Sequence, residues 1–195
     1  MIKLSPELLL GEGRDRLCFR HPDDACLCIK VAKKTEKQTR REKRYFTYLM
    51  ANPAKDCSQL SCYRGDVQTD QGIGALFDRV TNADGSDCLT LRQAIEAGQL
   101  SRAEVIELTQ QFKTYLWNNA ICVRDISTNN LMVRHDQNQQ KQLLMIDGVS
   151  NPGVNPLTIY WPWLARHYLQ KSWHSLEQKI ERAFSTLETR DSASR

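Results

Sequence analysis

The stretch from Val123 to Val133 limits the fold of this chain more than any other segment. It places the acidic Asp125 and the amide Asn130 five positions apart in a polar loop, between a helical pattern and a short apolar run. A second apolar run, residues 143–146, ends at Asp147-Gly148, and the two runs predict a β-hairpin. A positioned carboxylate can take a proton from a hydroxyl group, and Mg²⁺ prefers oxygen ligands. Asp and Asn also form ordinary turns, so a purely structural loop remains an alternative.

Two charged residues upstream lie on apolar elements. Lys30 ends the apolar run Leu27-Cys-Ile-Lys, where a buried ammonium group needs an anion. Glu42 lies in a predicted helix over residues 35–50, with Thr35 and Gln38 as its capping box. It shares the apolar face of that helix through the i, i+3, i+4, i+7 spacing, which favours a buried cation as its partner. The alternatives are a lysine that reaches solvent and a glutamate in a solvated ion pair.

The glycines of Leu10-Gly-Glu-Gly-Arg14 can let the backbone approach phosphate groups, or can form an ordinary turn. A hairpin is predicted from residues 17–20 and 26–31, and a further strand over 74–80. Helices are predicted from Thr90 to Gly98, from Ser101 with a capping box at Ser101 and Glu104, and after Pro162.

The order of strands followed by helices predicts an α+β fold. We expect a single domain over residues 1–195, with an N-terminal lobe over about 1–80 and a C-terminal lobe over about 84–190.

Composition limits the class of protein. Hydrophobic residues make up 41% and charged residues 26% of the chain, as in ordinary globular proteins. A net charge of +4 suits an anionic ligand such as a nucleotide. We expect no signal peptide and no membrane span, because no long apolar segment is present. The seven cysteines include no C-x-x-C pair, so reduced thiols in a cytoplasmic protein are expected.

The order of these motifs resembles that of the protein-kinase-like superfamily across Leu8 to Gly148. More closely, the chain resembles the PhoP regulatory network protein YrbL family, on the strength of Gly-Glu-Gly-Arg, the Arg41-Glu42 helix and the loop Arg124-Asp-Ile-Ser-Thr-Asn-Asn130. The resemblance implies a small two-lobed protein-kinase-like fold with a truncated helical C-terminal lobe. It also implies a gene under control of the PhoP regulator in a bacterium.

The resemblance to kinases implies ATP and Mg²⁺ as cofactors and a role for each motif residue. Gly11 and Gly13 would cover the phosphates, Lys30 would hold the α- and β-phosphates, Glu42 would pair with Lys30, Asp125 would be the catalytic base, and Asn130 and Asp147 would hold magnesium.

The chain departs from the kinase pattern in three places. Val123 stands where kinases have His, Asp147-Gly-Val replaces Asp-Phe-Gly, and no Ala-Pro-Glu segment follows. The loss of the Phe puts the in/out switching of kinases in doubt but not metal binding, and the missing Ala-Pro-Glu segment puts the usual peptide-docking platform in doubt. We therefore predict an ATP-dependent phosphotransferase whose acceptor is a sugar, another small molecule or a protein hydroxyl.

Two other functions remain open. The first alternative is a nucleotide-binding pseudokinase that acts as a regulatory or partner-binding protein. The second is a module that binds nucleic acid through the run from Lys30 to Arg44, which contains eight lysines and arginines. That run is typical of a solvated helix face, and the sequence leaves the oligomeric state open.

Overall fold

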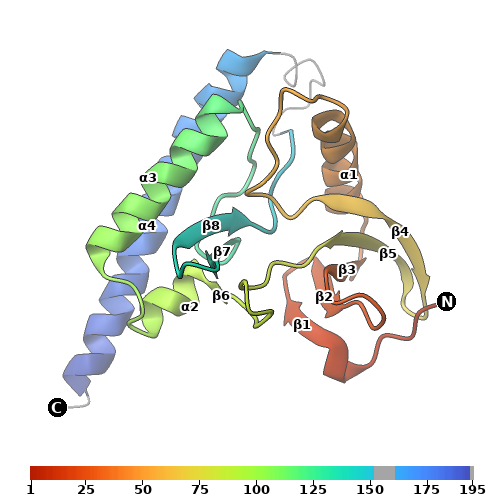
Figure 1. The fold of residues 1–195 in the computed structure, drawn as a ribbon, viewed down its shortest axis with the longest axis horizontal. Coiled ribbons are helices and arrows are strands. Elements are labelled where there is room, and N and C mark those ends of the chain that lie inside the picture. Colours follow the sequence, from red (N-terminus) through yellow and green to blue (C-terminus); the bar gives the residue numbers. More distant parts are fainter. Residues whose placement is uncertain (152–160, 194–195) are drawn as a thin grey trace. The chain divides into compact units, whose positions relative to one another are not determined.

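The computed structural model describes residues 1–151 and 161–193 and divides into two compact units. Unit 1 comprises residues 1–57 and 61–80, and unit 2 comprises residues 58–60 and those from 81 onward. Figure 1 shows the helices and strands of both units. Each unit is described by itself.

Unit 1 contains one antiparallel five-stranded sheet with the order β1-β2-β3-β5-β4. A short 3₁₀ helix, Pro6–Leu8, precedes it. The strands are β1 Leu9–Glu12, β2 Arg16–Arg20, β3 Leu27–Ala32, β4 Tyr63–Thr69 and β5 Gly72–Asp78.

The predicted hairpin of unit 1 is confirmed as β2 and β3, and the predicted strand 74–80 as β5. β4 was not predicted, because its side chains alternate between exposed and partly buried positions and include Arg64, Gly65 and Asp66. Its partner β5 supplies most of the apolar residues of that pair, and β4 adds Tyr63 and Val67.

Helix α1, Lys37–Met50, packs its apolar stripe into unit 1. Glu42, Tyr45, Phe46 and Leu49 are all buried on it, as the spacing predicted. The ring of Phe46 meets that of Phe77 on β5 edge to face, with 5.9 Å between centroids. The predicted capping box is wrong, because the helix starts at Lys37 and its N-cap Glu36 makes no side-chain capping bond.

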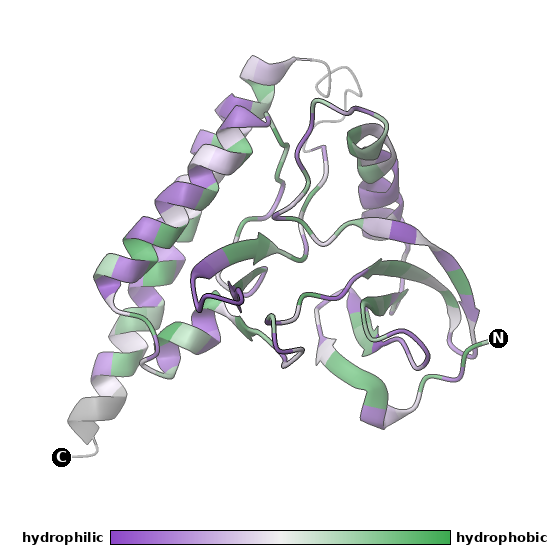
Figure 2. Cartoon of the chain, viewed as in Figure 1, coloured by the Kyte–Doolittle hydropathy of each residue, from purple (hydrophilic) through white to green (hydrophobic). Residues whose placement is uncertain are grey.

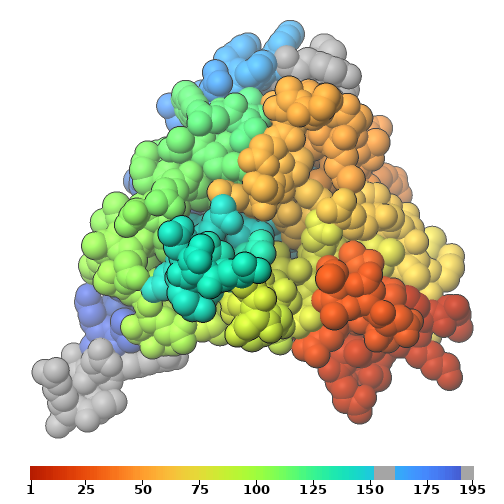
Figure 3. Space-filling model, in the orientation of Figure 1, coloured from red at the N-terminus to blue at the C-terminus, as the bar shows by residue number. Residues whose placement is uncertain are grey.

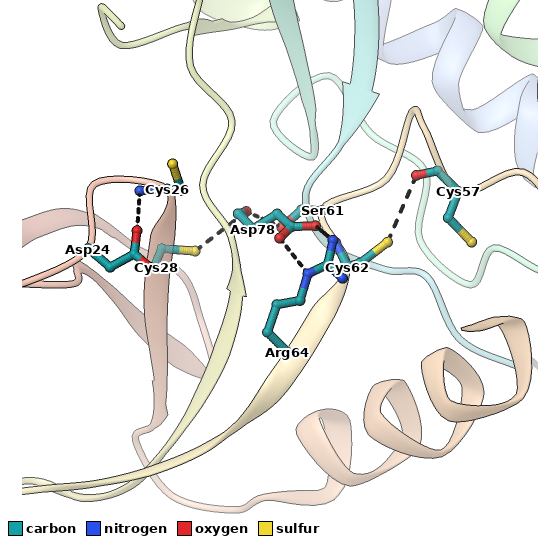
Figure 4. Close-up of polar contacts among 8 residues, drawn as sticks. All are labelled: Asp24, Cys26, Cys28, Cys57, Ser61, Cys62, Arg64 and Asp78. Carbon is teal, nitrogen blue, oxygen red and sulfur yellow. Dashed lines mark hydrogen bonds and ion pairs between the residues drawn. The ribbon is translucent and has the colours of Figure 1, made fainter. Parts of the chain in front are cut away.

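The end of β5 is held by a cluster of polar contacts around Asp78 (Figure 4). Its carboxylate accepts two hydrogen bonds from Arg64 on β4, at 2.7 and 2.8 Å, and one from the Cys62 amide at 3.2 Å. Its carbonyl oxygen accepts from the Ser61 hydroxyl at 2.6 Å and from the Cys28 thiol at 3.9 Å. These bonds join β3, β5 and the start of β4.

All seven cysteines have free thiols. A hydrogen bond with the Cys18 side chain, together with burial, raises the pKa of the Cys28 thiol, so this thiol stays protonated at neutral pH. A hydrogen bond from Cys62 lowers the pKa of Cys57 to about 7.

In the part of unit 2 that the structure describes, a three-stranded sheet of order β6-β7-β8 is combined with three helices. The strands are β6 Leu89–Thr90, β7 Leu131–His135 and β8 Lys141–Met145, and the helices are α2 Leu91–Glu96, α3 Arg102–Asn118 and α4 Pro162–Ala193. The predicted hairpin is confirmed as β7 and β8, and its turn lies at the surface in Figure 3. Both α2 and α3 begin with a capping box, the one on α3 at the predicted Ser101 and Glu104.

Polar and apolar residues alternate around α3 and α4, as Figure 2 shows by hydropathy. The buried positions on α4 include Leu169, Trp173, Leu176 and Phe184, and α4 contacts both α2 and α3. Within residues 1–151 and 161–193, no helix combines the length and apolar character that crossing a membrane requires.

We predict that the charge of Glu104 stabilises unit 2 in a pH-dependent way. Lys141 Nζ lies 2.7 Å from this carboxylate, and Ser101 also donates to it, which lowers the pKa of Glu104 from 4.5 to about 2. The ionised form therefore contributes stability above pH 4.5, which is lost as the pH falls towards about 2. Glu104→Gln keeps the capping box but removes the charge. Its urea midpoint should lie below that of the wild type at pH 7, and the gap should narrow below pH 4.5.

The control is Glu107→Gln, the same change on the same helix away from Lys141. It should shift the midpoint little at any pH. A gap for Glu104→Gln that stays constant from pH 7 to pH 3 would contradict the assignment.

Candidate functional site

The loop that follows α3 is anchored by buried apolar residues on one side of Asp125. Ile121, Cys122 and Val123 are almost fully buried, and Val123 forms a β-bridge with Val149. The Arg124 amide donates to the Gly148 carbonyl at 2.8 Å. The segment that leads into Asp125 is therefore paired with the segment that leaves Asp147.

Gly148 allows these two segments to approach closely. Its φ is +83°, a conformation that side chains disfavour, and a Cβ placed on it would lie 2.3 Å from the Asp125 carbonyl oxygen. Glycine is required here for both reasons. The Asp-Gly pair that the sequence analysis singled out thus brings Asp147 next to the Asp125 loop.

Asn130 closes the loop from its other end. Its Nδ2 donates to the Asp125 carbonyl at 3.1 Å, and its own carbonyl accepts from the Ile146 amide at 2.9 Å. Asp147 Oδ1 accepts from the Gly148 amide at 2.6 Å. Asp125, Asn130 and Asp147 were all predicted from the sequence. They therefore lie on two chain segments that hydrogen bonds hold together.

The residues present fit a magnesium ion better than a transition metal. In the described part of the chain, no group of three or more His, Cys, Asp or Glu side chains is placed to hold a metal. The Asn130 nitrogen is used within the loop, which leaves its side-chain oxygen for a cation. One amide oxygen and one carboxylate suit Mg²⁺, which usually keeps water and substrate phosphates as its other ligands.

Asp125 has a partner that the sequence analysis missed. Lys179 Nζ on α4 lies 3.5 Å from Asp125 Oδ1 and donates to the Ile126 carbonyl at 3.3 Å. The Asp125 side chain is 66% exposed, so a substrate can still reach it. The sequence offers no signal for this contact, because only the packing of α4 brings a residue 54 positions away to the loop.

In unit 1, Lys30 is buried in the middle of the sheet. It is 6% exposed, its register neighbours are Cys18 and Ala75, and its Nζ lies 4.0 Å from the centre of the Phe77 ring. The register places it on the sheet face that also carries Phe77, the partner of Phe46 on α1. The ring face offsets part of the cost of burying the ammonium group.

Glu42 pairs with a cation that the sequence analysis did not single out. Arg16 Nη1 on β2 lies 2.5 Å from Glu42 Oε2, and the two side chains are 5% and 2% exposed. Arg16 and Cys18 lie two positions apart on β2 and therefore on the same face of the sheet. Because Cys18 is the register neighbour of Lys30, Arg16 shares the sheet face of Lys30. The predicted Glu42–Lys30 pairing stays a prediction. The position of Arg16 gave one indication of this pair. Arg16 is the first residue of β2, and the register of the hairpin places it opposite Ala32 at the end of β3.

The two predicted glycines lie at the β1–β2 connection. Gly11 is in β1, and the Gly13 amide donates to the Arg16 carbonyl at 2.8 Å. Lys33 Nζ donates to the Gly13 carbonyl at 2.8 Å and pairs with Glu12. Neither glycine has positive φ, and a Cβ on Gly11 would meet nothing within 4 Å. The local fold therefore does not need a glycine at position 11.

Comparison with known proteins matches almost the whole chain to one family. The sequence profile of the family described as PhoP regulatory network protein YrbL matches residues 2–181. The uncharacterized protein YrbL of Escherichia coli (strain K12) is 30% identical over 179 residues, which cover 89% of this chain and 85% of that protein. The same values hold for the uncharacterized protein YrbL of Shigella flexneri.

A solved structure supports the fold. The crystal structure of the Mycobacterium tuberculosis PknI kinase domain matches with a TM-score of 0.51 and 14% sequence identity, over 84% of this chain and 69% of that one. At this identity the match shows the fold alone. The predicted α+β, protein-kinase-like fold and the predicted family resemblance are confirmed.

We predict that Gly148→Ala destabilises unit 2 more than Gly85→Ala does. Both glycines have nearly the same φ, +83° and +84°, but an added Cβ meets the Asp125 backbone only at Gly148 and meets nothing at Gly85. Gly85→Ala should cost about 1–2 kcal/mol, the price of the left-handed conformation, and Gly148→Ala clearly more. Urea unfolding measures both. Equal losses would show that the contact with Asp125 is not tight.

We also predict that removing the Glu42 carboxylate leaves a costly buried cation. Glu42→Leu should lower the free energy of unfolding by about 3–5 kcal/mol, because the ion pair that Arg16 makes with Glu42 in a desolvated position is lost. Asp66→Asn is the matched control, since it breaks the half-exposed pair that Lys43, on the same helix, makes at 2.5 Å. That change should cost at most about 1 kcal/mol. Similar costs for the two variants would contradict the assignment.

Proposed function

Because the chain belongs to the PhoP regulatory network protein YrbL family and has the fold of a kinase domain, we propose that it is an ATP-dependent phosphotransferase. The proposal is supported above all by the close approach of the Asp125 and Gly148 backbones and by the bond from Asn130 to the Asp125 carbonyl, which bring the proposed base Asp125 near the proposed magnesium ligands Asn130 and Asp147. The acceptor is a hydroxyl group. In line with the family's description, we place the protein in a PhoP-regulated network of a bacterium, in the cytoplasm, where ATP is present.

Asp125 is the proposed catalytic base. Its exposed carboxylate takes the proton of the acceptor hydroxyl while that oxygen forms a bond to the γ-phosphorus of ATP. The bond from this phosphorus to the bridging oxygen breaks, and its electron pair leaves with ADP. Asn130 and Asp147 hold the magnesium, which, when bound, neutralises the charge on the phosphate oxygens.

The residues of unit 1 bind the nucleotide phosphates in this proposal. Lys30 brings a positive charge to a buried strand position, where an anion gains more from it than in water. The Arg16–Glu42 pair fixes α1 against the sheet face that carries Lys30. Gly11 and Gly13 carry no side chains, so the backbone at the end of β1 and at the start of the β1–β2 connection can approach the phosphates.

One observation favours the alternative, a nucleotide-binding pseudokinase. The Asp125 carboxylate is paired with Lys179 Nζ at 3.5 Å, so a cation of this chain already occupies one of its oxygens. A regulatory protein that binds ATP and transfers slowly would need Lys30, Asn130 and Asp147 but not Asp125. A comparison of variants separates the two functions.

We predict that ATP binding, measured by calorimetry, needs magnesium and needs Asp147. Asp147→Asn should weaken binding of magnesium-ATP by about tenfold or more, because a carboxylate ligand of the metal is lost. Asp125→Asn should leave this affinity nearly unchanged while it abolishes phosphate transfer to water or to an added acceptor.

Asp136→Asn serves as the control, because Asp136 caps the exposed β7–β8 turn through its own carboxylate. It should bind magnesium-ATP as the wild type does. No binding at millimolar ATP would overturn the proposed function. Binding without transfer, unchanged in Asp125→Asn, would instead establish the pseudokinase.

A further inference from the structure

A polar cavity of about 360 Å³ lies within unit 2, beside the loop that carries Asp125. Its wall is formed by the start of α2, by the loop residues that follow Ile126, and by the second half of α4. Figure 1 shows α2 next to α4, in agreement with their contacts. The volume is near the lower end of the range for small-molecule sites, about 300–1,000 Å³.

Three cations line this cavity, namely Arg92, Lys179 and Arg182, and none of its described lining residues is acidic. Arg92 is partly balanced by Glu96 at 2.8 Å, and Lys179 by Asp125 at 3.5 Å. Among the described residues, no carboxylate forms an ion pair with Arg182. The cavity therefore carries an excess of positive charge.

Hydroxyl groups complete the lining. Ser127 and Thr128 come from the loop, and Thr128 is 4% exposed. The Thr128 carbonyl accepts from the Arg92 amide at 3.1 Å, which fixes the loop to the start of α2. Guanidinium groups, an ammonium group and hydroxyls in one cavity are the donors that bind phosphate groups.

We propose that this cavity binds the phosphate group of the acceptor, so that the substrate is a small phosphorylated molecule with a free hydroxyl, such as a sugar phosphate. The inference rests on the proposed phosphotransferase function. Lys179 links the two sites, because one ammonium group contacts Asp125 and also lines the cavity. A phosphate held there leaves the rest of a small molecule within reach of Asp125.

The transfer then runs on a bound phosphate ester. A hydroxyl of the acceptor loses its proton to Asp125 and forms a bond to the γ-phosphorus of ATP, and the bond to the ADP oxygen breaks. The products are ADP and a bisphosphorylated molecule. The phosphate already on the acceptor takes no part in the reaction and serves only to hold it.

The test measures anion binding apart from ATP binding. Calorimetry with inorganic phosphate, glucose 6-phosphate and glucose, at low salt and without ATP, compares the wild type with Arg182→Gln. Phosphate and glucose 6-phosphate should bind the wild type and glucose should not. Arg182→Gln should weaken both by about tenfold or more, since charge-assisted hydrogen bonds are lost. Its affinity for magnesium-ATP should be unchanged.

Lys171→Gln is the control, an exposed cation on the same helix that does not line the cavity. It should bind phosphate as the wild type does. Equal weakening in Lys171→Gln and Arg182→Gln would show general charge attraction and overturn the inference. Complete displacement of phosphate by ATP would also overturn it, because the cavity would then belong to the nucleotide.

The two proposals fail separately in this experiment. If magnesium-ATP binds and phosphate does not, the cavity inference fails and the phosphotransferase stands. If phosphate binding depends on Arg182 and magnesium-ATP does not bind, the anion site stands, and both its role as an acceptor site and the proposed transfer fail.

Discussion

The candidate site in unit 2 depends on the close approach of the Gly148 backbone to the Asp125 carbonyl. No side chain fits between them, and the hydrogen bond from Arg124 to Gly148 and that from Asn130 to Asp125 hold the same two segments together. The close approach at Gly148 and the bond from Arg124 join backbone atoms, and the Asn130 side-chain amide adds a bond to the Asp125 carbonyl. The positions of Asp125, Asn130 and Asp147 are therefore set by the fold. The proposed transfer would require such fixed positions, because small displacements of reacting groups are costly.

Unit 1 shows a different use of polar groups, because it buries charge. Arg16, Lys30 and Glu42 all lose water, which costs free energy that an ion pair alone often does not recover. Apolar residues of similar size would fill this face of the sheet at less cost. In the proposed function, an anion bound by Lys30 would offset part of this cost. The pairing of Glu42 with Arg16 and the Phe77 ring, which lies 4.0 Å from Lys30 Nζ, offset another part.

The sequence predicted the elements whose pattern is local. The β2–β3 and β7–β8 hairpins, the capping box of α3 and the buried face of α1 follow from spacing over a few residues. β4 was not predicted, because about half of its residues face solvent. The ion pairs of Arg16 and Lys179 were not predicted for another reason, since each residue meets its partner only when distant segments of the chain pack together. In the site itself, the sequence pointed to Asp125, Asn130 and Asp147, but the requirement for Gly148 became clear only from its φ and its distance to Asp125.

Lys179 connects the two proposed sites of unit 2, because one ammonium group contacts the Asp125 carboxylate at 3.5 Å and also lines the cavity with Arg92 and Arg182. A phosphate bound in the cavity, as we propose, would compete with Asp125 for this ammonium group. Binding of the acceptor would then release the Asp125 carboxylate to contact the acceptor hydroxyl, and water alone would not have this effect. In this scheme, the cation beside the exposed carboxylate makes transfer depend on the substrate.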